Sequence, residues 1–451
     1  MIETEGRRVL VVGYGRSGRA AAGYLKRHGA TVTVVDRADT PALRAAIEQD
    51  GVAGRLGDAT PPDLDGTDVL VVSPGVAWDA PLVEGARQRG IQVTSEMDLF
   101  FELCPSPIAG ITGTNGKTTT TALTAEVLRS GGFNVIRGGN IGEPVLDRVD
   151  QLRAEDWVVL ELSSFQLESI RHPRLRVGAV LNVTPDHLDR HRSMAQYRQI
   201  KSRAVSFMEP DDHAILNFDD PSCVAMARQT RGQVLPFAVR SSLDAGIRVV
   251  DGAICRTDSS GTEPVVPVRE VPLPGAHNLA NVMAAVGAGL AAGVAAGRIG
   301  DAVRSFKAVE HRLELLGTYR GVRWYNDSKA TNPDSTYKAL EAFVEPIVLI
   351  AGGRNKGIDV LPLAKAIAGR VSGLVTMGEM GEELERLARR EGLDDVYHAR
   401  DLADAVHRAA AMAKAGSVVL LSPAFTSFDM FADYEDRGRQ FKAAVRSEFS
   451  R

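Results

Sequence analysis

A glycine-rich segment near residue 110 carries the residue types that bind nucleotide phosphates. It follows the apolar run 108–112, precedes a helical pattern and reads GTNGKTT. In such a loop the backbone N–H groups surround the phosphates, the lysine contacts the β and γ phosphates, and the next hydroxyl reaches Mg²⁺. The spacing departs from the usual loop, because Ile111 stands where the first glycine is expected. The predicted contacts are Gly113, Thr114, Asn115, Gly116, Lys117, Thr118 and Thr119.

A carboxylate after a neighbouring predicted strand is a candidate ligand for Mg²⁺. Glu161 directly follows the apolar run 157–160. Phosphate-binding loops usually have such an acid, which holds the metal directly or through water. The alternative is a solvent-facing acid at the end of a strand. Together with the loop, Glu161 makes ATP and Mg²⁺ the leading cofactors.

The polar segment 182–191, NVTPDHLDRH, has four potential metal ligands within six positions. His187 together with oxygen donors could hold a second divalent metal. Alternatively, the segment is a loop in which Thr184 or Asp186 caps a helix. Lys201 lies about four turns beyond His187 if the chain between them is helical, and an isolated lysine there is normally a surface residue.

A second glycine motif, Gly13-Tyr-Gly15-Arg-Ser-Gly18, lies between a predicted strand and a predicted helix. Asp36 ends the next strand, where a dinucleotide site has its ribose-binding acid. The pattern fits NAD. It also fits other nucleotide diphosphates, because glycines let any diphosphate approach a helix N-terminus. A tight turn without a ligand is the third interpretation.

Alternating short apolar runs and helical patterns predict parallel sheets with helices on their faces. Strands are expected at 9–12, 31–35, 69–72, 108–112, 157–160, 178–182, 347–350, 374–377 and 418–421, and helices at 16–28, 41–50 and from Met194. Residues 247–271 are β-branched and turn-rich, which indicates small antiparallel strands. We therefore predict an α/β protein of three domains. These are a Rossmann-like domain (1–96), a central P-loop ATPase-like domain with the small antiparallel addition (97–310), and a C-terminal Rossmann-like domain (311–451).

The composition excludes several classes of protein. The 451 residues include 53 Lys plus Arg and 57 Asp plus Glu, a formal charge of −4 without a basic block, which argues against a nucleic-acid partner. Three widely spaced cysteines indicate neither a disulfide framework nor a zinc site. The charged N-terminal residues do not resemble a signal peptide, so we expect a cytoplasmic protein. The uncharged stretch 278–297 is rich in Ala and Gly, and we expect a buried helix there rather than a membrane span.

Taken together and in this order, the motifs resemble the Mur ligase family, the ATP-dependent amide-forming enzymes of peptidoglycan precursor synthesis. The resemblance covers essentially the whole chain, through GTNGKTT at 113–119, LELSSFQLE around Glu161, NVTPDHLDRH, HNLAN at 277–281, EHR at 310–312 and NDSKATN at 326–332. Within the family, GYGRSG, GGNIG at 138–142, LELSSFQLE, NDSKATN and LLSPAFTSFD are most similar to the members that add D-glutamate to UDP-N-acetylmuramoyl-L-alanine.

The resemblance changes the interpretation of the first domain and adds two magnesium sites. It implies that this domain binds the UDP-sugar rather than NAD, with Asp36 near either uracil or ribose. The implied contacts are Arg16, Ser17, Asp36, Arg37, Ser73 and Gly75, with Asn140 and His187 near the muramoyl-alanine end. One Mg²⁺ is implied at Thr118 and Glu161, and a second at His187 and Lys201. Lys201 matches a lysine that is carbamylated in the family, a change that turns a cation into a carboxylate-like ligand.

The resemblance also assigns contacts to the rest of the chain, whose third domain is expected to close over the site. Asn278, Asn281, Arg312, Asp327 and Lys329 are expected near ATP. The expected D-glutamate contacts are Thr331, Lys356, Ser427, Phe428 and Tyr434, of which Tyr434 stands where these members usually have Phe.

The implied reaction is amide formation through an acyl phosphate. Lys117, His187 and Lys201 are the implied catalytic residues, and a monomer is expected. One alternative is a related ligase that uses another amino acid. Another is an NAD-dependent oxidoreductase, which would rest on the first glycine motif alone and leave Lys117 and Glu161 without roles. A third is a nucleotide-binding switch without catalysis.

Overall fold

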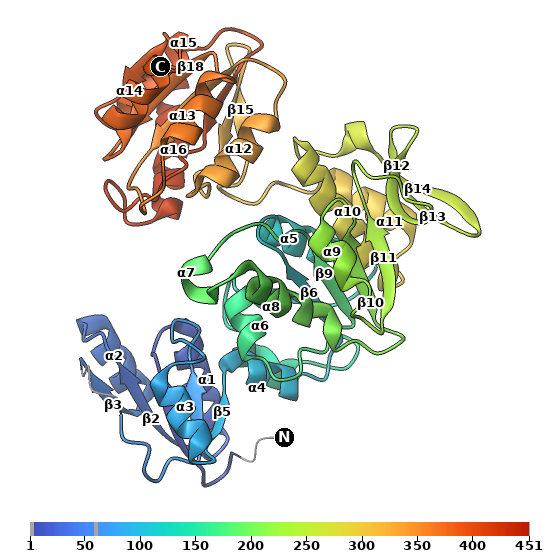
Figure 1. Ribbon diagram of the computed structural model, residues 1–451, viewed down its shortest axis with the longest axis vertical. Helices are drawn as coiled ribbons and strands as arrows, with labels where there is room; N and C mark the ends of the chain where they lie inside the picture. The colour runs from blue at the N-terminus through green and yellow to red at the C-terminus, as the bar shows by residue number, and fades with distance from the viewer. Residues whose placement is uncertain (1–3, 58–61, 451) are drawn as a thin grey trace. The chain divides into compact units, whose positions relative to one another are not determined.

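The computed structural model describes residues 4–57 and 62–450, with three β-sheets in that part of the chain (Figure 1). The side chains of Leu188 and Asp189 lie outside this description, and with them one potential ligand of the 182–191 segment. By its internal contacts the chain divides into two compact units. The first is Met1–Pro267 with Ala280–Val303, and the second is Val268–Leu279 with Arg304–Arg451. The domain boundaries expected from the sequence stay predictions.

The first sheet is wholly parallel and has the strand order β3-β2-β1-β4-β5. This order, with helices between the strands, confirms the predicted Rossmann-like domain. The strands are β1 (Arg8–Val12), β2 (Thr31–Asp36), β3 (Ala53–Leu56), β4 (Val69–Val72) and β5 (Gln92–Thr94), and the helices are α1 (Arg16–Arg27), α2 (Pro41–Asp50) and α3 (Pro81–Gln88).

The second sheet has nine strands in the order β14-β13-β12-β11-β10-β9-β6-β8-β7. Strands β6 to β12 pair in parallel, and β12, β13 and β14 form the small antiparallel addition that the sequence predicts. The strands are β6 (Ile108–Thr112), β7 (Val135–Gly139), β8 (Trp157–Glu161), β9 (Val177–Val180), β10 (His213–Asn217), β11 (Gln233–Phe237), β12 (Gly246–Val250), β13 (Ala253–Asp258) and β14 (Gly261–Pro267). The helical segments are α4 (Glu96–Leu103), α5 (Lys117–Ser130), η1 (Val145–Gln151), α6 (Ser164–Ser169), α7 (Leu188–His191), α8 (Met194–Ser206), α9 (Pro221–Met226), η2 (Val268–Glu270), α10 (Ala276–Ala291) and α11 (Ala296–Ser305).

The third sheet has the order β15-β16-β20-β17-β18-β19, with one antiparallel pair, β15 and β16, at its edge. The other pairs are parallel, as a Rossmann-like domain requires. The strands are β15 (Glu314–Tyr319), β16 (Val322–Asn326), β17 (Ile347–Gly352), β18 (Gly373–Met377), β19 (Val396–His398) and β20 (Val418–Leu421), and the helices are α12 (Pro333–Glu341), α13 (Leu361–Ala368), α14 (Gly381–Arg390), α15 (Leu402–Met412) and α16 (Tyr434–Phe449).

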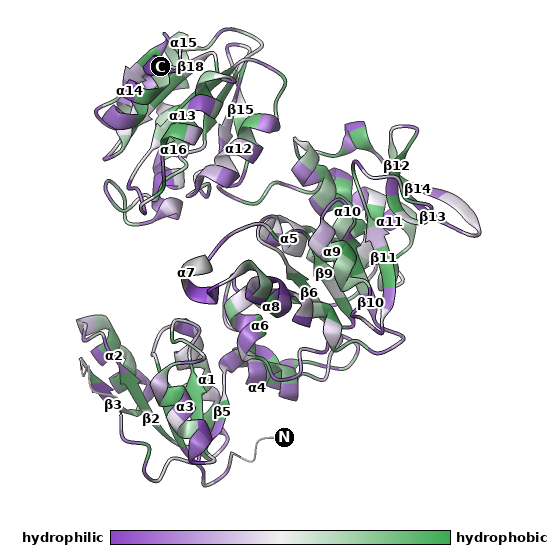
Figure 2. Ribbon diagram, in the orientation of Figure 1, coloured by the Kyte–Doolittle hydropathy of each residue, from purple (hydrophilic) through white to green (hydrophobic). Residues whose placement is uncertain are grey.

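Hydrophobic residues are concentrated on the central strands of the sheets, as Figure 2 shows. Every residue of β6, β8, β9, β17 and β20 is buried. This is why these strands read in the sequence as continuous apolar runs instead of alternating ones, because helices cover both faces of a parallel sheet. The local pattern was therefore sufficient to locate them.

Two sequence expectations need correction in detail. The strand expected at 178–182 is β9 (Val177–Val180), so Asn182 lies beyond its end. The chain between His187 and Lys201 is not one helix, because α7 ends at His191 and α8 begins at Met194, with Arg192 at a φ of 58° between them. A left-handed residue cannot continue an α-helix.

The Ala- and Gly-rich stretch forms helix α10, as expected, and its segment 282–286 is fully buried. Gly293, with a φ of 82°, follows the end of this helix before α11 begins. Within residues 4–57 and 62–450, every helix is too short or too polar to cross a membrane.

Candidate functional site

The glycine-rich loop joins β6 to the N-terminus of α5, which begins at Lys117. Gly116, just before the helix, has a φ of 87°, a conformation that favours glycine. A Cβ atom there would lie 3.0 Å from Asn281 Cγ and closer still to its Oδ1. Helix α10 therefore brings Asn281 against the loop. Lys117 Nζ folds back and donates to the carbonyls of Gly113 (3.0 Å) and Thr114 (2.8 Å).

Asn182, which the sequence did not single out as a site residue, holds the loop in place. Its Oδ1 accepts from the Asn115 N–H (2.9 Å), its Nδ2 donates to the Asn115 carbonyl (3.1 Å), and its own carbonyl accepts from the Thr114 N–H (2.9 Å). The Thr114 hydroxyl lies 3.0 Å from the Thr184 carbonyl and 3.3 Å from the Tyr197 hydroxyl. The segment after β9 and helix α8 therefore fix the conformation of the loop. The only sequence signal was the position of Asn182 at the end of a predicted strand.

Lys201, on α8, is buried below the same loop, with 1 % of its surface exposed, so the surface-lysine alternative is wrong. Its Nζ donates to the Gly113 carbonyl (2.8 Å), which also accepts from Lys117, and it lies 4.7 Å from the centre of the Tyr197 ring. Burial, followed by the charge of Lys117, lowers the pKa of Lys201 well below its usual value. The site therefore contains a buried amine whose charged form is disfavoured by its surroundings.

Glu161 is the last residue of β8, where it is paired with Ile111 of β6 and Gly139 of β7. Only 3 % of its surface is exposed, so the solvent-facing alternative is wrong. Asn140 Nδ2 donates to its Oε1 (3.1 Å), whereas Oε2 has no hydrogen-bond partner among the residues that the structure describes. A buried carboxylate oxygen without a partner is costly, and an oxygen-seeking cation would satisfy it. The Asn140 contact also joins a residue expected at the sugar nucleotide to one expected at the metal.

The two histidines of the 182–191 segment occupy different environments. His187 is exposed, with a φ of 52°; its Nε2 lies 3.5 Å from Asp186 Oδ2, and its ring meets Phe165 edge-on. His191 is fully buried, with its Nε2 2.8 Å from the Ser164 hydroxyl and its ring stacked on Phe165. Of the two, His187 is free to approach a ligand, and its roles remain predictions.

The first glycine motif forms a tight turn between β1 and α1. A Cβ at Gly18 would lie 3.0 Å from the Gly13 carbonyl carbon and closer still to its oxygen, and the Ser73 hydroxyl donates to the same carbonyl (2.7 Å). Asp36 accepts the Tyr14 N–H (2.7 Å) and the Ala38 N–H (2.9 Å), so both of its oxygens already hold the backbone of the turn.

The remaining predicted UDP-sugar contacts lie around this turn and on β7. Arg16 donates to the Gly142 carbonyl (3.3 Å), which joins the turn to the segment that carries Asn140. Arg16, Arg37 and Gly75 are exposed, and Ser17 is half-buried.

Polar residues of the second compact unit gather where β16 and β20 end side by side, with Asn326 paired to Leu421. Asp327 is buried; its oxygens accept the Leu313 N–H (3.2 Å) and the Ser422 hydroxyl (2.8 Å). Burial raises its pKa to about 7, against the attraction of Arg312.

The residues predicted to bind D-glutamate lie on loops after the same strands. Backbone bonds between Arg354 and Thr426 (2.9 and 3.2 Å) join the loop that carries Lys356 to the loop that carries Ser427. Ser427 is buried, whereas Lys356 is exposed and Phe428 is 60 % exposed. The Tyr434 hydroxyl donates to Glu435 (3.0 Å), and burial raises its pKa to about 12. The Tyr434 ring lies 5.4 Å from Lys329 Nζ. Thr331, in the loop after β16, is half-buried. Asn278, at the start of α10, donates to the Pro274 carbonyl (2.8 Å).

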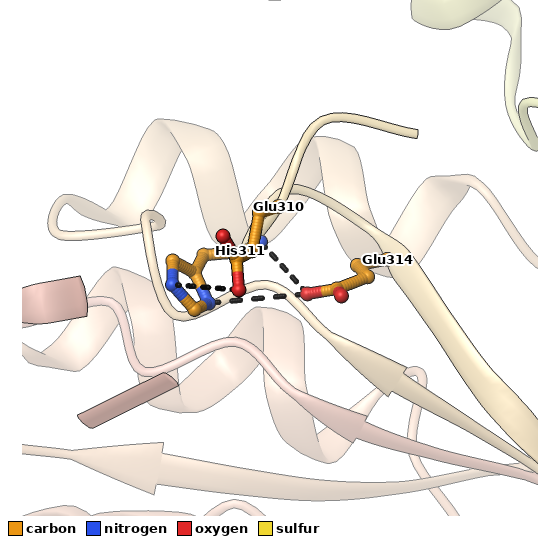
Figure 3. A group of neighbouring side chains, drawn as sticks. All are labelled: Glu310, His311 and Glu314. Carbon is orange, nitrogen blue, oxygen red and sulfur yellow. Dashed lines mark hydrogen bonds and ion pairs between the residues drawn. The ribbon is translucent and has the colours of Figure 1, made fainter. Parts of the chain in front are cut away.

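Glu310, His311 and Glu314 form a cluster of potential metal ligands beside Arg312 (Figure 3). The Glu314 carboxylate accepts the His311 N–H (2.9 Å). Lys442 on α16 donates to both Glu310 and Glu314, so an ammonium group already bridges the two carboxylates and offsets part of their charge. The cluster therefore anchors the segment that carries Arg312.

Three family models match the chain in sequence order. They are the MurD-like N-terminal domain of Mur ligases (residues 7–95), the Mur ligase middle domain (111–289) and the Mur ligase glutamate ligase domain (311–425). The chain belongs to the Mur ligase family. Members are ATP-dependent amide ligases, and this chain is one, which agrees with the phosphate-binding loop. These matches do not support an NAD-dependent oxidoreductase or a switch without catalysis.

Curated relatives match over nearly the whole chain. The chain is 42 % identical over 444 residues to a UDP-N-acetylmuramoylalanine–D-glutamate ligase from Pelotomaculum thermopropionicum, covering 98 % of each chain. It is 43 % identical over 448 residues to the protein of the same name from Koribacter versatilis, covering 99 % of this chain and 98 % of the other.

Solved Mur ligase structures share the fold. The MurF ligase from Thermotoga maritima in complex with ADP matches with a TM-score of 0.62 and 16 % identity, covering 99 % of this chain and 95 % of the other. The UDP-N-acetylmuramate–alanine ligase from the same organism matches with a TM-score of 0.59 and 19 % identity, covering 98 % and 99 %.

Proposed function

We propose that the protein joins D-glutamate to UDP-N-acetylmuramoyl-L-alanine and converts ATP to ADP and phosphate, a step of peptidoglycan precursor synthesis. The full-length similarity to relatives named D-glutamate ligases supports D-glutamate as the amino acid. The ATP chemistry is supported by the loop that presents Lys117 at the start of α5. A related ligase with another amino acid is the alternative.

In the proposed reaction, an oxygen of the alanyl carboxylate attacks the γ-phosphorus of ATP, and ADP leaves. The amine of D-glutamate then attacks the acyl-phosphate carbon, and the tetrahedral intermediate collapses to the amide as phosphate leaves and the nitrogen loses a proton. Lys117 and the N–H groups at the start of α5 would stabilise the charge on the phosphoryl oxygens. Lys117 is held by the Gly113 and Thr114 carbonyls, so on binding ATP it would exchange these acceptors for phosphate oxygens.

We propose Mg²⁺ at Thr118 and Glu161, and a second Mg²⁺ at His187 and Lys201. The unpartnered Oε2 of Glu161 fits the first ion, because magnesium prefers oxygen ligands. When bound, the ions would neutralise phosphate charge. Asn140 would orient Glu161 for this task by holding its other oxygen.

Carbamylation of Lys201 is part of the proposal. The neutral Nζ would attack the carbon of CO₂ and lose one proton, which leaves a carbamate anion. Two lysine Nζ atoms donate to the single Gly113 carbonyl, so the change would place a carbamate anion, instead of a second amine, beside the Lys117 cation. The lowered pKa of Lys201 supports the reaction, since only the free amine is nucleophilic.

The remaining contacts are proposed from the family motifs. For UDP-N-acetylmuramoyl-L-alanine they are Arg16, Ser17, Asp36, Arg37, Ser73, Gly75, Asn140 and His187; for ATP, residues 113–119 with Asn278, Asn281, Arg312, Asp327 and Lys329; and for D-glutamate, Thr331, Lys356, Ser427, Phe428 and Tyr434. One chain carries all of these residues, so we propose a monomer. The two nucleotide substrates support a cytoplasmic location.

The proposal is tested by measuring phosphate release from ATP and UDP-N-acetylmuramoyl-L-alanine with single amino acids. D-glutamate should drive release in a one-to-one ratio with amide product, whereas L-alanine, L-glutamate and diamino acids should not. Release driven by a diamino acid and not by D-glutamate would establish the alternative. Release without any amide product would overturn the ligase reaction.

A further inference from the structure

Arg437, on the first turns of α16, is a fully buried arginine that connects two loops. Its Nε and Nη2 donate to the hydroxyl (3.0 Å) and carbonyl (2.8 Å) of Ser328. Its Nη1 and Nη2 also donate to the Phe425 carbonyl (3.2 and 3.3 Å). One guanidinium therefore bonds the loop after β16 and the loop after β20 at the same time.

Both loops carry residues proposed to contact substrates. Ser328 lies between Asp327 and Lys329, with Thr331 further along, and Phe425 lies two residues before Ser427. The Ser328 hydroxyl in turn donates to the Tyr434 carbonyl (2.8 Å), so the start of α16 is bonded to the first loop as well. The spacing between these loops thus depends on the guanidinium that lies between them.

The chemistry of Arg437 makes this connection specific. Its hydrogen bonds go to a hydroxyl and two carbonyls instead of a carboxylate, and burial lowers its pKa to about 10. Burial of this cation is costly even though the carboxylates of Asp429 and Asp327 attract it, and stability alone would favour an apolar side chain. The planar fork of donors also has a fixed geometry that the single ammonium of lysine cannot reproduce.

We propose that Arg437 is a positioning residue for the amino-acid substrate. It sets the distance between the loop of Thr331 and the loop of Ser427 without touching the substrate itself. The inference rests on the proposed D-glutamate site. A second connection, from the Ala424 N–H to the Ala330 carbonyl (2.9 Å), would remain in a variant, so loosened loops are expected instead of an unfolded domain.

The test compares Arg437→Lys with a matched change on the same helix, Phe441→Leu. Phe441 is fully buried and packs near Trp324 (6.3 Å between ring centres), with no part in the loop contacts described above. We expect Arg437→Lys to raise KM for D-glutamate at least tenfold, with KM for UDP-N-acetylmuramoyl-L-alanine within twofold of wild type. Phe441→Leu should lower Tm but leave KM for D-glutamate within twofold.

A second variant, Ser328→Ala, keeps the test decisive if Arg437→Lys does not fold. It removes one acceptor of Arg437 and should raise KM for D-glutamate about threefold. An unchanged KM for D-glutamate in the folded variants, or an equal rise in Phe441→Leu, would overturn the positioning role. If wild type uses a different amino acid, the D-glutamate proposal fails, and KM for that amino acid in the same variants decides the role of Arg437.

Discussion

Gly438 lies inside α16, where helix propensity and packing predict opposite effects of an alanine substitution on stability. Replacing an interior helical glycine by alanine stabilises a helix by roughly 0.5–1 kcal/mol. In this helix, however, a Cβ at residue 438 would lie 2.7 Å from Cε1 and 2.8 Å from Cγ of His311, and closer still to Nδ1. His311 is buried and its Nδ1 is 2.9 Å from Asn326 Nδ2, so its ring cannot move without breaking this contact.

The packing cost should exceed the gain in propensity. Overpacking a core costs about 1–3 kcal/mol, and leaving a buried polar group without its partner costs about 1–3 kcal/mol more. After subtraction of the gain in propensity, we therefore expect Gly438→Ala to destabilise the protein by roughly 1–5 kcal/mol. Since His311 adjoins Arg312, a proposed ATP contact, KM for ATP should also rise several-fold.

Thermal unfolding followed by circular dichroism, with KM for ATP measured on the same samples, tests this expectation. Gly85→Ala in α3 is the matched control, because the nearest atom to its added Cβ is Leu64 Cδ1 at 4.0 Å. That variant should keep or slightly raise Tm. A stabilised Gly438→Ala with normal KM for ATP would refute the assignment of Gly438 as the residue that makes room for His311.

Three further predictions concern the phosphate-binding loop, the buried lysine and pH. Lys117→Ala should abolish ligation while circular dichroism stays native, and near-normal turnover would remove the loop from the mechanism. Lys201→Ala should lose activity that acetate, as a carboxylate surrogate, partly restores; full activity without acetate would contradict the carbamate. Burial, helped by nearby Lys338 and Arg312, lowers the pKa of His277 to about 4. The unfolded chain therefore binds the proton more tightly, and stability should fall by up to about 1.4 kcal/mol per unit as pH drops from 6.5 towards 4. The free energy of unfolding of His277→Gln, measured in urea across this pH range, should lack the contribution of His277. If its slope with pH equals that of wild type, the lowered pKa of His277 is contradicted.

Much of the fold could be predicted from local patterns. Apolar runs such as 418–421 and 69–72 coincide with β20 and β4, because strands buried on both faces contain few polar residues. The short strand β5 (Gln92–Thr94) was missed, since three residues carry too little pattern. At the site, Glu161 could be identified because it directly follows an apolar run.

Other site residues could not be predicted because their partners are distant in sequence. Asn182 bonds Asn115 across 67 positions, which requires β9 to lie beside β6. Arg437 bonds Ser328 across 109 positions, and its sequence context is that of an ordinary surface helix. For Lys201, the spacing alone indicates a surface residue; the family resemblance singled it out, but its burial depends on the packing of α8 against the loop.

The sequence by itself determined the phosphate-binding chemistry and the alternation of strands and helices. Both are local properties, since consecutive backbone N–H groups at a helix start bind phosphate, and continuous apolar runs form buried strands. Only the tertiary structure decided which polar residues are buried and what they contact. The parallel strands return the chain to one edge of each sheet, and there Lys201 meets Lys117 at the Gly113 carbonyl, Asn140 meets Glu161, and Arg437 joins two loops. These contacts set the charge of the buried groups and the spacing of the loops, and no local sequence pattern encodes either.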